Sequence, residues 1–104
     1  MNERINKLKE FLQASPDDSF LNHALALEYI KLGNDAEAKL LFEKILANQP
    51  DYVGSYYHLA KLQERMNDND AAMKTYEAGM ASAKKNGDNH AYNELQAAYE
   101  ELIY

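Results

Sequence analysis

One stretch of this sequence recurs after about 34 residues, and a period of that length is typical of stacked helical hairpins. The positions that recur keep their size and polarity: Leu25 and Leu59, Ala26 and Ala60, Ala38 and Ala72, Phe42 and Tyr76, Leu46 and Met80. Within the first copy, Gly33 separates two helix-like segments and Pro50 ends the second. We therefore expect an array of helix pairs, because each pair can bury its apolar face only against a neighbour.

Apolar residues recur at helical spacing along the whole chain, and the alternation typical of strands is absent. Residues that favour strands are scarce, since the chain has one Val and one Thr. The pattern predicts an all-α protein. Six helices are expected, over residues 2–14, 17–32, 35–48, 52–66, 70–85 and 89–103.

The corners between these helices carry recognisable turn and cap residues. Pro16 is expected in the first turn of the second helix, where a missing N–H is tolerated. Gly33 and Gly87 are expected to end helices in the left-handed conformation. Asn34 is expected to cap the third helix, in a capping box with Glu37. These turn and cap residues therefore predict where the helices end. No segment of the sequence reads as a linker between domains.

Length and charge narrow the classes of function. The chain has 104 residues, the size of one domain, and a formal net charge of −6 from 17 acidic and 11 basic residues. An acidic domain is a poor match for nucleic acid, which binds basic surfaces. A neutral or basic protein or peptide partner fits the overall charge better.

Cysteine content and hydropathy indicate which kinds of site and which cellular locations fit the chain. The chain has no cysteine, so disulfides and thiolate metal sites are excluded. Residues 1–8 carry charges where a signal peptide has an apolar run, and no apolar run is long enough to cross a membrane. The sequence therefore predicts a soluble, cytoplasmic protein without a membrane partner.

The repeated residues resemble the tetratricopeptide repeat family. Its pattern has a large aromatic, Leu-Gly/Ala and Tyr in the first helix, then Ala, an aromatic and a closing Pro in the second. The matching places in the two copies are held by Asn22, Leu25, Ala26, Tyr29, Ala38, Phe42 and Pro50, and by Tyr56, Leu59, Ala60, Gln63, Ala72, Tyr76 and Lys84. Asn22, Gln63 and Gln96 depart from the pattern, and the second closing Pro is missing.

Half-repeats at both ends extend the resemblance over nearly the whole chain. The expected organisation is a single tetratricopeptide-like domain over 1–104: a half-repeat (1–16), repeat one (17–50), repeat two (51–85) and a C-terminal capping helix (88–104). The resemblance implies a right-handed solenoid of antiparallel helix hairpins with a concave wall. Small residues, Ala26 and Ala60 among them, are expected where helices of one hairpin approach closely.

In this family the first helix of each hairpin lines the concave wall. By resemblance, the residues expected to bind a peptide or partner helix are Phe20, His23, Leu27, Ile30, Tyr57, His58, Lys61 and Asn93. Phe20, Leu27 and Tyr57 are expected near one another, on first helices of neighbouring hairpins. Their apolar surplus suggests a groove or an interface. The alternative is that a short array closes on itself and buries them.

Catalytic and metal chemistry have no pattern in the sequence. No carboxylate pair accompanies a nucleophile, and neither a G-x-S-x-G motif nor a Gly-rich phosphate loop occurs. His23, His58 and His90 form no H-x-x-x-H pair, so neither a metal nor another cofactor is expected. Some family members bind a C-terminal carboxylate through Lys and Asn, but those places hold His23 and Leu27 here, so such binding is not implied.

The last predicted helix carries a second stripe, Tyr92, Tyr99 and Ile103, which either packs on the preceding helix or forms an assembly surface.

The expected function is that of a non-catalytic protein–protein interaction module, not an enzyme. It would hold a peptide or partner helix in its concave groove. The alternative is a self-associating scaffold protein of the same family, for example a homodimer.

Overall fold

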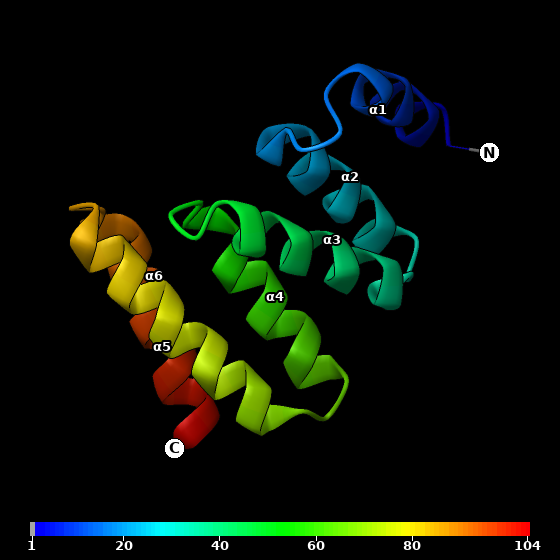
Figure 1. Cartoon of the computed structure of the whole chain (residues 1–104). Helices are drawn as coiled ribbons and strands as arrows, with labels where there is room; N and C mark the ends of the chain where they lie inside the picture. Colours follow the sequence, from blue (N-terminus) through cyan, green and yellow to red (C-terminus); the bar gives the residue numbers. More distant parts are fainter. Residues whose placement is uncertain (1) are drawn as a thin grey trace. The chain divides into compact units, whose positions relative to one another are not determined.

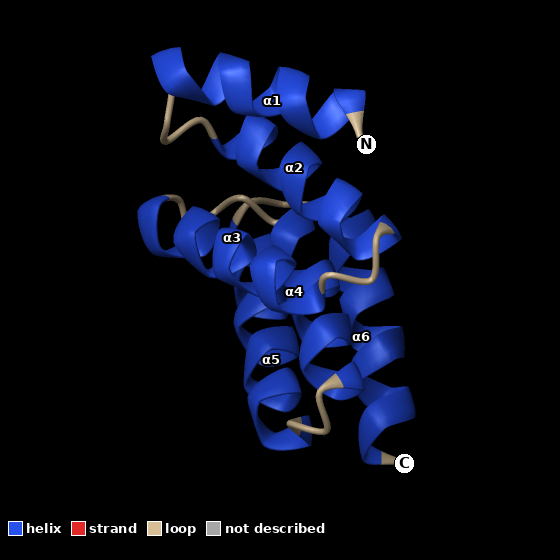
Figure 2. Ribbon diagram, turned by 90° about the vertical axis from the view of Figure 1, so that its right-hand side faces the viewer, coloured by secondary structure: helices blue, strands red, loops and turns tan. Residues whose placement is uncertain are grey.

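The structure is a computed structural model that describes residues 2–104. It has six helices (Figure 1): α1 (Glu3–Ala14), α2 (Ser19–Lys31), α3 (Asp35–Asn48), α4 (Gly54–Arg65), α5 (Asn69–Lys85) and α6 (Asn89–Ile103). Figure 2 shows helices joined by short loops, and residues 2–104 contain no strand. The prediction of an all-α protein with six helices is confirmed.

The chain divides into two compact units. Unit 1 (Met1–Gln49) holds α1, α2 and α3, and unit 2 (Pro50–Tyr104) holds α4, α5 and α6. In each unit the middle helix packs against both others. No helix within residues 2–104 is both long enough and apolar enough to cross a membrane.

Three helices end in the same backbone motif. Gly33, Asn67 and Gly87 adopt positive φ angles of 76°, 62° and 70°. The residue after each donates its backbone N–H to a carbonyl in the last turn of the helix, as Asn34 does to Tyr29 over 2.8 Å. This is the Schellman motif, which pairs carbonyls that a helix end otherwise leaves open. The predicted roles of Gly33 and Gly87 are confirmed.

Aspartates cap three helices, but two other predicted details were wrong. Asp18 accepts a hydrogen bond from the N–H of Leu21 over 2.9 Å at the start of α2. Pro16 therefore lies in the turn before α2 and not in its first turn. Asn34 is the residue that precedes α3, yet its side chain makes no capping bond, so no capping box forms with Glu37. Asp68 has the same ψ of 69° and an equivalent backbone bond, yet it caps α5, so the difference lies in the side chain: a carboxylate is favoured over a neutral amide at the positive end of a helix.

The residues that recur in the sequence form the core of each unit. Buried in both copies are Leu25 and Leu59, Ala26 and Ala60, Ala38 and Ala72, and Phe42 and Tyr76. In unit 1, the cluster of Ile5, Leu8, Ala24 and Leu25 joins α1 to α2, with Tyr29 packed against it. Residues 2–14 thus pack as the predicted amphipathic helix, because their apolar face is the one that α2 covers.

The departures from the family pattern are accommodated locally. Asn22 is buried, and its Nδ2 donates to the carbonyl of Pro16 over 3.1 Å. One repeat later, the hydroxyl of Tyr56 donates to the carbonyl of Pro50 over 2.6 Å. Two side chains of different size thus supply the same hydrogen bond to equivalent carbonyls. The buried amide of Asn22 thereby finds a hydrogen-bond partner, as buried polar groups need.

Candidate functional site

A pocket of about 330 Å³ lies on the face of α2 that the core of unit 1 leaves open. Its apolar lining comes from Phe20, Ala24 and Leu27, with His23 beside them. Phe20 is 69% exposed, whereas Leu27 and His23 are half-buried. Three of the predicted binding residues therefore surround one pocket. They come together because residues three, four and seven apart share a face of a helix.

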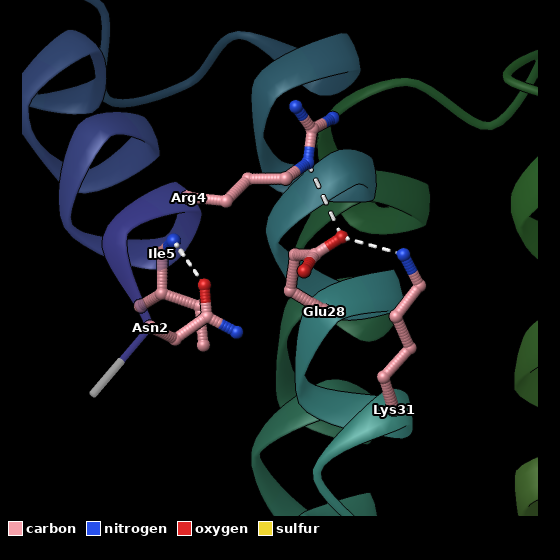
Figure 3. A network of polar contacts seen from close by, with 5 residues as sticks. All are labelled: Asn2, Arg4, Ile5, Glu28 and Lys31. Carbon is pink, nitrogen blue, oxygen red and sulfur yellow. Dashed lines mark hydrogen bonds and ion pairs between the residues drawn. The ribbon is translucent and has the colours of Figure 1, made fainter.

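The polar edge of this pocket is an ion-pair cluster that joins α1 to α2. Figure 3 shows Arg4 and Lys31 reaching the same carboxylate, that of Glu28. The Nε of Arg4 lies 3.2 Å and the Nζ of Lys31 3.0 Å from Oε2 of Glu28. The hydrogen bond from Lys31, with the nearby charge of Arg4, lowers the pKa of Glu28 against the opposing effect of burial. Glu28 is therefore negatively charged at neutral pH.

Local structure holds Arg4 at this edge. Asn2 caps α1, since its Oδ1 accepts a hydrogen bond from the N–H of Ile5 over 3.1 Å (Figure 3). Ile5 is buried against α2, and this places the neighbouring Arg4 beside Glu28. The position of Arg4 therefore depends on a helix cap and on one core residue.

His23 has a core neighbour as well as the pocket. Its ring meets that of Phe42 edge-on, with 5.3 Å between centroids. Phe42 is fully buried, so His23 covers the core of the hairpin while it faces the pocket. Ile30, also predicted to bind, is half-buried and does not line this pocket.

A second group of predicted residues lies on α4 in unit 2. The rings of Tyr57 and His58 meet edge-on at 5.7 Å, and the Nζ of Lys61 lies 5.6 Å from the centroid of the Tyr57 ring. The latter distance suits a cation–π contact. Lys61 also pairs with Glu64 at 3.7 Å. Burial lowers the pKa of His58, which favours the neutral imidazole, although the charge of Glu94 opposes the shift.

The predicted set is thus found on three helices. Phe20, His23 and Leu27 share the α2 pocket, while Tyr57, His58 and Lys61 form a contiguous group on α4. Asn93 is exposed on α6. Since Phe20 and Leu27 belong to unit 1 and Tyr57 to unit 2, their mutual proximity stays a prediction.

Sequence reasoning missed Arg4 and did not predict that Glu28 would lie at the edge of this pocket. Glu28 lies in a helix that is apolar on several sides, with Lys31 three residues later. A lone acidic residue in such a helix, followed by a lysine at ion-pair spacing, is a signal that could have indicated the cluster. Arg4 gave no comparable signal, because its partner is 24 residues away.

A further hollow, of about 430 Å³, lies on α1 and includes Arg4, Lys7 and the half-exposed Phe11. Arg4 and Lys7 take the places that Ala38 and Leu41 have one repeat later. Two positions of α1 are therefore charged where the equivalent positions of α3 are apolar.

Two further predictions concern the second stripe on α6 and metal binding by the histidines. The hydroxyl of Tyr99 donates to Oε2 of Glu77 on α5 over 3.0 Å, so this member of the stripe faces α5. Within residues 2–104, no group of three or more His, Cys, Asp or Glu side chains could hold a metal ion.

Comparison with known proteins identifies the family. A model of the tetratricopeptide repeat family matches residues 29–99, which is more than half of the chain. The chain belongs to the tetratricopeptide repeat family. The fold that this family predicts, helix hairpins without strands, is the fold found in residues 2–104.

Solved tetratricopeptide repeat structures resemble the chain over most of its length. The tetratricopeptide repeat domain protein of Salinibacter ruber is 42% identical, with a TM-score of 0.80 over 83% of this chain and 96% of that one. The TPR2B domain of yeast Sti1, solved in complex with pHsp70, has a TM-score of 0.87 over 95% of this chain and 79% of that one. At 19% identity, the second likeness shows the fold alone.

One curated relative is much longer than this chain. The pre-mRNA-splicing factor CLF1 of Eremothecium gossypii is 31% identical over 84 residues. The match includes 77% of this chain but only 12% of that protein. It therefore extends the family likeness to one segment of a larger protein.

Proposed function

We propose that this chain is a non-catalytic binding module that holds a peptide or a partner helix against the open face of α2. Tetratricopeptide repeat domains are typically protein–protein interaction modules. The Sti1 domain, whose fold this chain shares, was solved with a protein ligand, and this supports a ligand of the same general kind here.

The exposure of Phe20 is the observation that carries the proposal. A phenylalanine that is 69% exposed, beside a pocket lined by Leu27 and Ala24, leaves apolar surface in water. Burial of that surface by a ligand would be favourable, because apolar area contributes roughly 25 cal/mol per Å² when it leaves water. The mixture of an aromatic, an aliphatic and a few charged groups suits a short apolar peptide or an amphipathic helix.

The module would work by binding alone. The described side chains around the pocket comprise ion pairs, apolar groups and one imidazole, without a nucleophile next to a base. Enzymes of the acyl-transfer type need that juxtaposition. The proposed role is therefore to hold a partner in place.

A pair of matched variants tests the proposal. Peptides selected by phage display on the full chain provide a ligand whose affinity can be measured by fluorescence anisotropy. Phe20→Ala should weaken that affinity by about 1–3 kcal/mol, as loss of an aromatic anchor does. Leu40→Ala removes an equally exposed residue, 61% exposed, from α3 and should leave it unchanged. Equal affinities in both variants would contradict the proposal, provided that urea melts show both are folded.

Self-association is the second candidate, and the exposed Phe11 on α1 and Ile103 on α6 favour it. Sedimentation equilibrium at high protein concentration separates the two. A strict monomer would favour a different partner, whereas a stable dimer that Phe11→Ser or Ile103→Ser dissociates would favour a scaffold built from copies of this chain.

A further inference from the structure

We propose that the Arg4–Glu28–Lys31 cluster is a subsite for an acidic side chain of the bound peptide. The aspartate or glutamate would pair with Arg4 and Lys31 while a neighbouring apolar side chain occupies the surface of Phe20 and Leu27. This inference rests on the proposed function, because it names the chemistry of the peptide that the α2 pocket would take.

The charge count of the cluster is the first argument. Two cations share one carboxylate, so the cluster has an excess of one positive charge. The side chain of Glu28 is 8% exposed, whereas those of Arg4 and Lys31 are 62% and 71% exposed. The negative group is therefore inside and the positive groups face the solvent, where a ligand would meet them.

The donors of these cations are the second argument. Arg4 directs its Nε to Glu28, and Figure 3 shows its two terminal nitrogens pointing away from that carboxylate. The ammonium group of Lys31 has three donors and directs one to Glu28. A guanidinium presents its donors in a geometry that matches a carboxylate, so a ligand carboxylate can bind without displacing Glu28.

Glu28 has a positioning role in this arrangement. It holds the two cations at 3.2 Å and 3.0 Å from one oxygen, and both are thereby fixed at the edge of the pocket. Long side chains that are already ordered lose less entropy when a ligand binds. The carboxylate of Glu28 also repels the acidic ligand, so its net effect on affinity depends on which contribution is larger.

The apolar part of the pocket sets the spacing of the ligand. Leu27 and Lys31 are one helical turn apart on the same face of α2. A peptide that places an apolar and an acidic side chain about one turn apart would contact both. The overall charge of −6 disfavours a peptide that is acidic along its whole length, so the ligand is expected to carry a single acidic side chain at this subsite.

Terminally blocked peptides provide the probe. Two acetylated and amidated peptide pools share a leucine followed, after three random positions, by glutamate in one pool and glutamine in the other. Blocking removes the terminal carboxylate, so only the side chain can supply the negative charge. Amide chemical shifts of Ala24, Leu27 and Glu28, followed by NMR on the full chain, report binding to the pocket.

The two peptide pools separate a failure of the proposed subsite from a failure of the proposed binding module. We expect the glutamate pool to bind about two- to fivefold more tightly than the glutamine pool at low salt, as one exposed ion pair allows. The difference should shrink when NaCl rises from about 20 to about 500 mM, because salt screens exposed charges. Equal binding of both pools would overturn the subsite but leave the binding module intact. If neither pool shifts the pocket resonances while phage-selected peptides do, the subsite also fails.

Charge-neutralising variants complete the test. Arg4→Gln and Lys31→Gln should each remove most of the preference for glutamate. Lys39→Gln neutralises an ion-paired lysine of α3 outside the pocket and is the matched control, which should keep the preference. The same loss in Lys39→Gln as in Arg4→Gln would overturn the proposal, because only the total charge would then matter.

Discussion

A Cβ atom placed on Gly79 would lie 2.7 Å from the Cβ of Tyr56. The same atom would lie 3.0 Å from a methyl group of Leu95, so α4, α5 and α6 meet at this glycine. In the first repeat the sizes are exchanged, since Ile45 takes the place of Gly79 and Asn22 that of Tyr56. Ile45 and Asn22 are both buried, so in each repeat this pair of positions combines one large and one small residue, as dense packing favours.

The first prediction is that Gly79→Ala destabilises the protein. Helix propensity alone would make alanine more favourable by about 1 kcal/mol. The new methyl group, however, would overlap Tyr56 next to its backbone, where a side-chain rotation cannot make room. Overpacking of this kind costs about 1–3 kcal/mol, so we expect a net decrease in the free energy of unfolding. Urea denaturation measures it.

Ala78→Gly is the control for this prediction. Ala78 is exposed on the same helix, so its replacement should cost only the propensity, about 1 kcal/mol. If Gly79→Ala instead raised the midpoint of unfolding, propensity would outweigh the contact with Tyr56, and the close approach of the helices would be wrong.

The second prediction concerns the small residues inside each hairpin. Ala26 and Ala60 are fully buried, and leucine at either position must displace its neighbours. Ala26→Leu and Ala60→Leu should each lower the free energy of unfolding by about 1–3 kcal/mol. Ala36→Leu, at an exposed position of α3, should have little effect. Unchanged urea midpoints for both buried variants would mean that the pairing of the helices is wrong.

The third prediction is a loss of stability at mildly acidic pH that depends on His58. Burial lowers the pKa of His58 below its ordinary value of 6.5. Between the lowered pKa and 6.5 the unfolded chain binds more protons than the folded chain, so the free energy of unfolding decreases as the pH falls through this range. His58→Gln should make that decrease smaller. An NMR titration of the native imidazole that gives a pKa above 6.5 would contradict the prediction.

The fourth prediction applies at alkaline pH. Tyr76 is fully buried and its hydroxyl donates to Glu64. Burial first, and this hydrogen bond second, raise the pKa of Tyr76 above 10.0. Above that pH the folded chain retains a proton that the unfolded chain loses, so stability decreases as the pH rises. Tyr76→Phe should reduce this decrease while it lowers stability at neutral pH by about 1 kcal/mol. If the free energy of unfolding fell as steeply with rising pH in Tyr76→Phe as in the unaltered chain, the role given to Tyr76 would be refuted.

The fifth prediction is that Zn²⁺ does not bind tightly. His23 contacts a core phenylalanine, and no described cluster offers three metal-ligating side chains. Structural zinc sites use four ligands. Calorimetric titration with ZnCl₂ should therefore show no stoichiometric binding. Tight binding of one ion that is lost in His23→Ala would show that this histidine has been misread.

Much of the fold could be predicted from the sequence because its signals are local. The spacing of apolar residues indicated the six helices, and Gly33 and Gly87 indicated where two of them end. The details that failed, at Pro16 and Asn34, concern which of several adjacent residues caps a helix. Such choices differ by about 1 kcal/mol, and contacts from elsewhere in the unit can decide them.

The candidate site was predictable only in part. Phe20, His23 and Leu27 share a pocket because helical periodicity alone places them on one face of α2. The period likewise indicated that Ala26 and Phe42 would be buried, and the repeat pattern indicated the family. These properties follow from residues close together in the chain, or from the recurrence of the pattern.

The tertiary structure decided which side chains meet between helices. Arg4 lies beside Glu28 because α1 packs on α2 at one particular register, and Gly79 lies against Tyr56 because α5 crosses α4 there. Repeat spacing predicts that two helices pair, but not the rotation and displacement that bring a given pair of atoms into contact. Those depend on the volumes of all the side chains between the helices, which only the folded chain brings together.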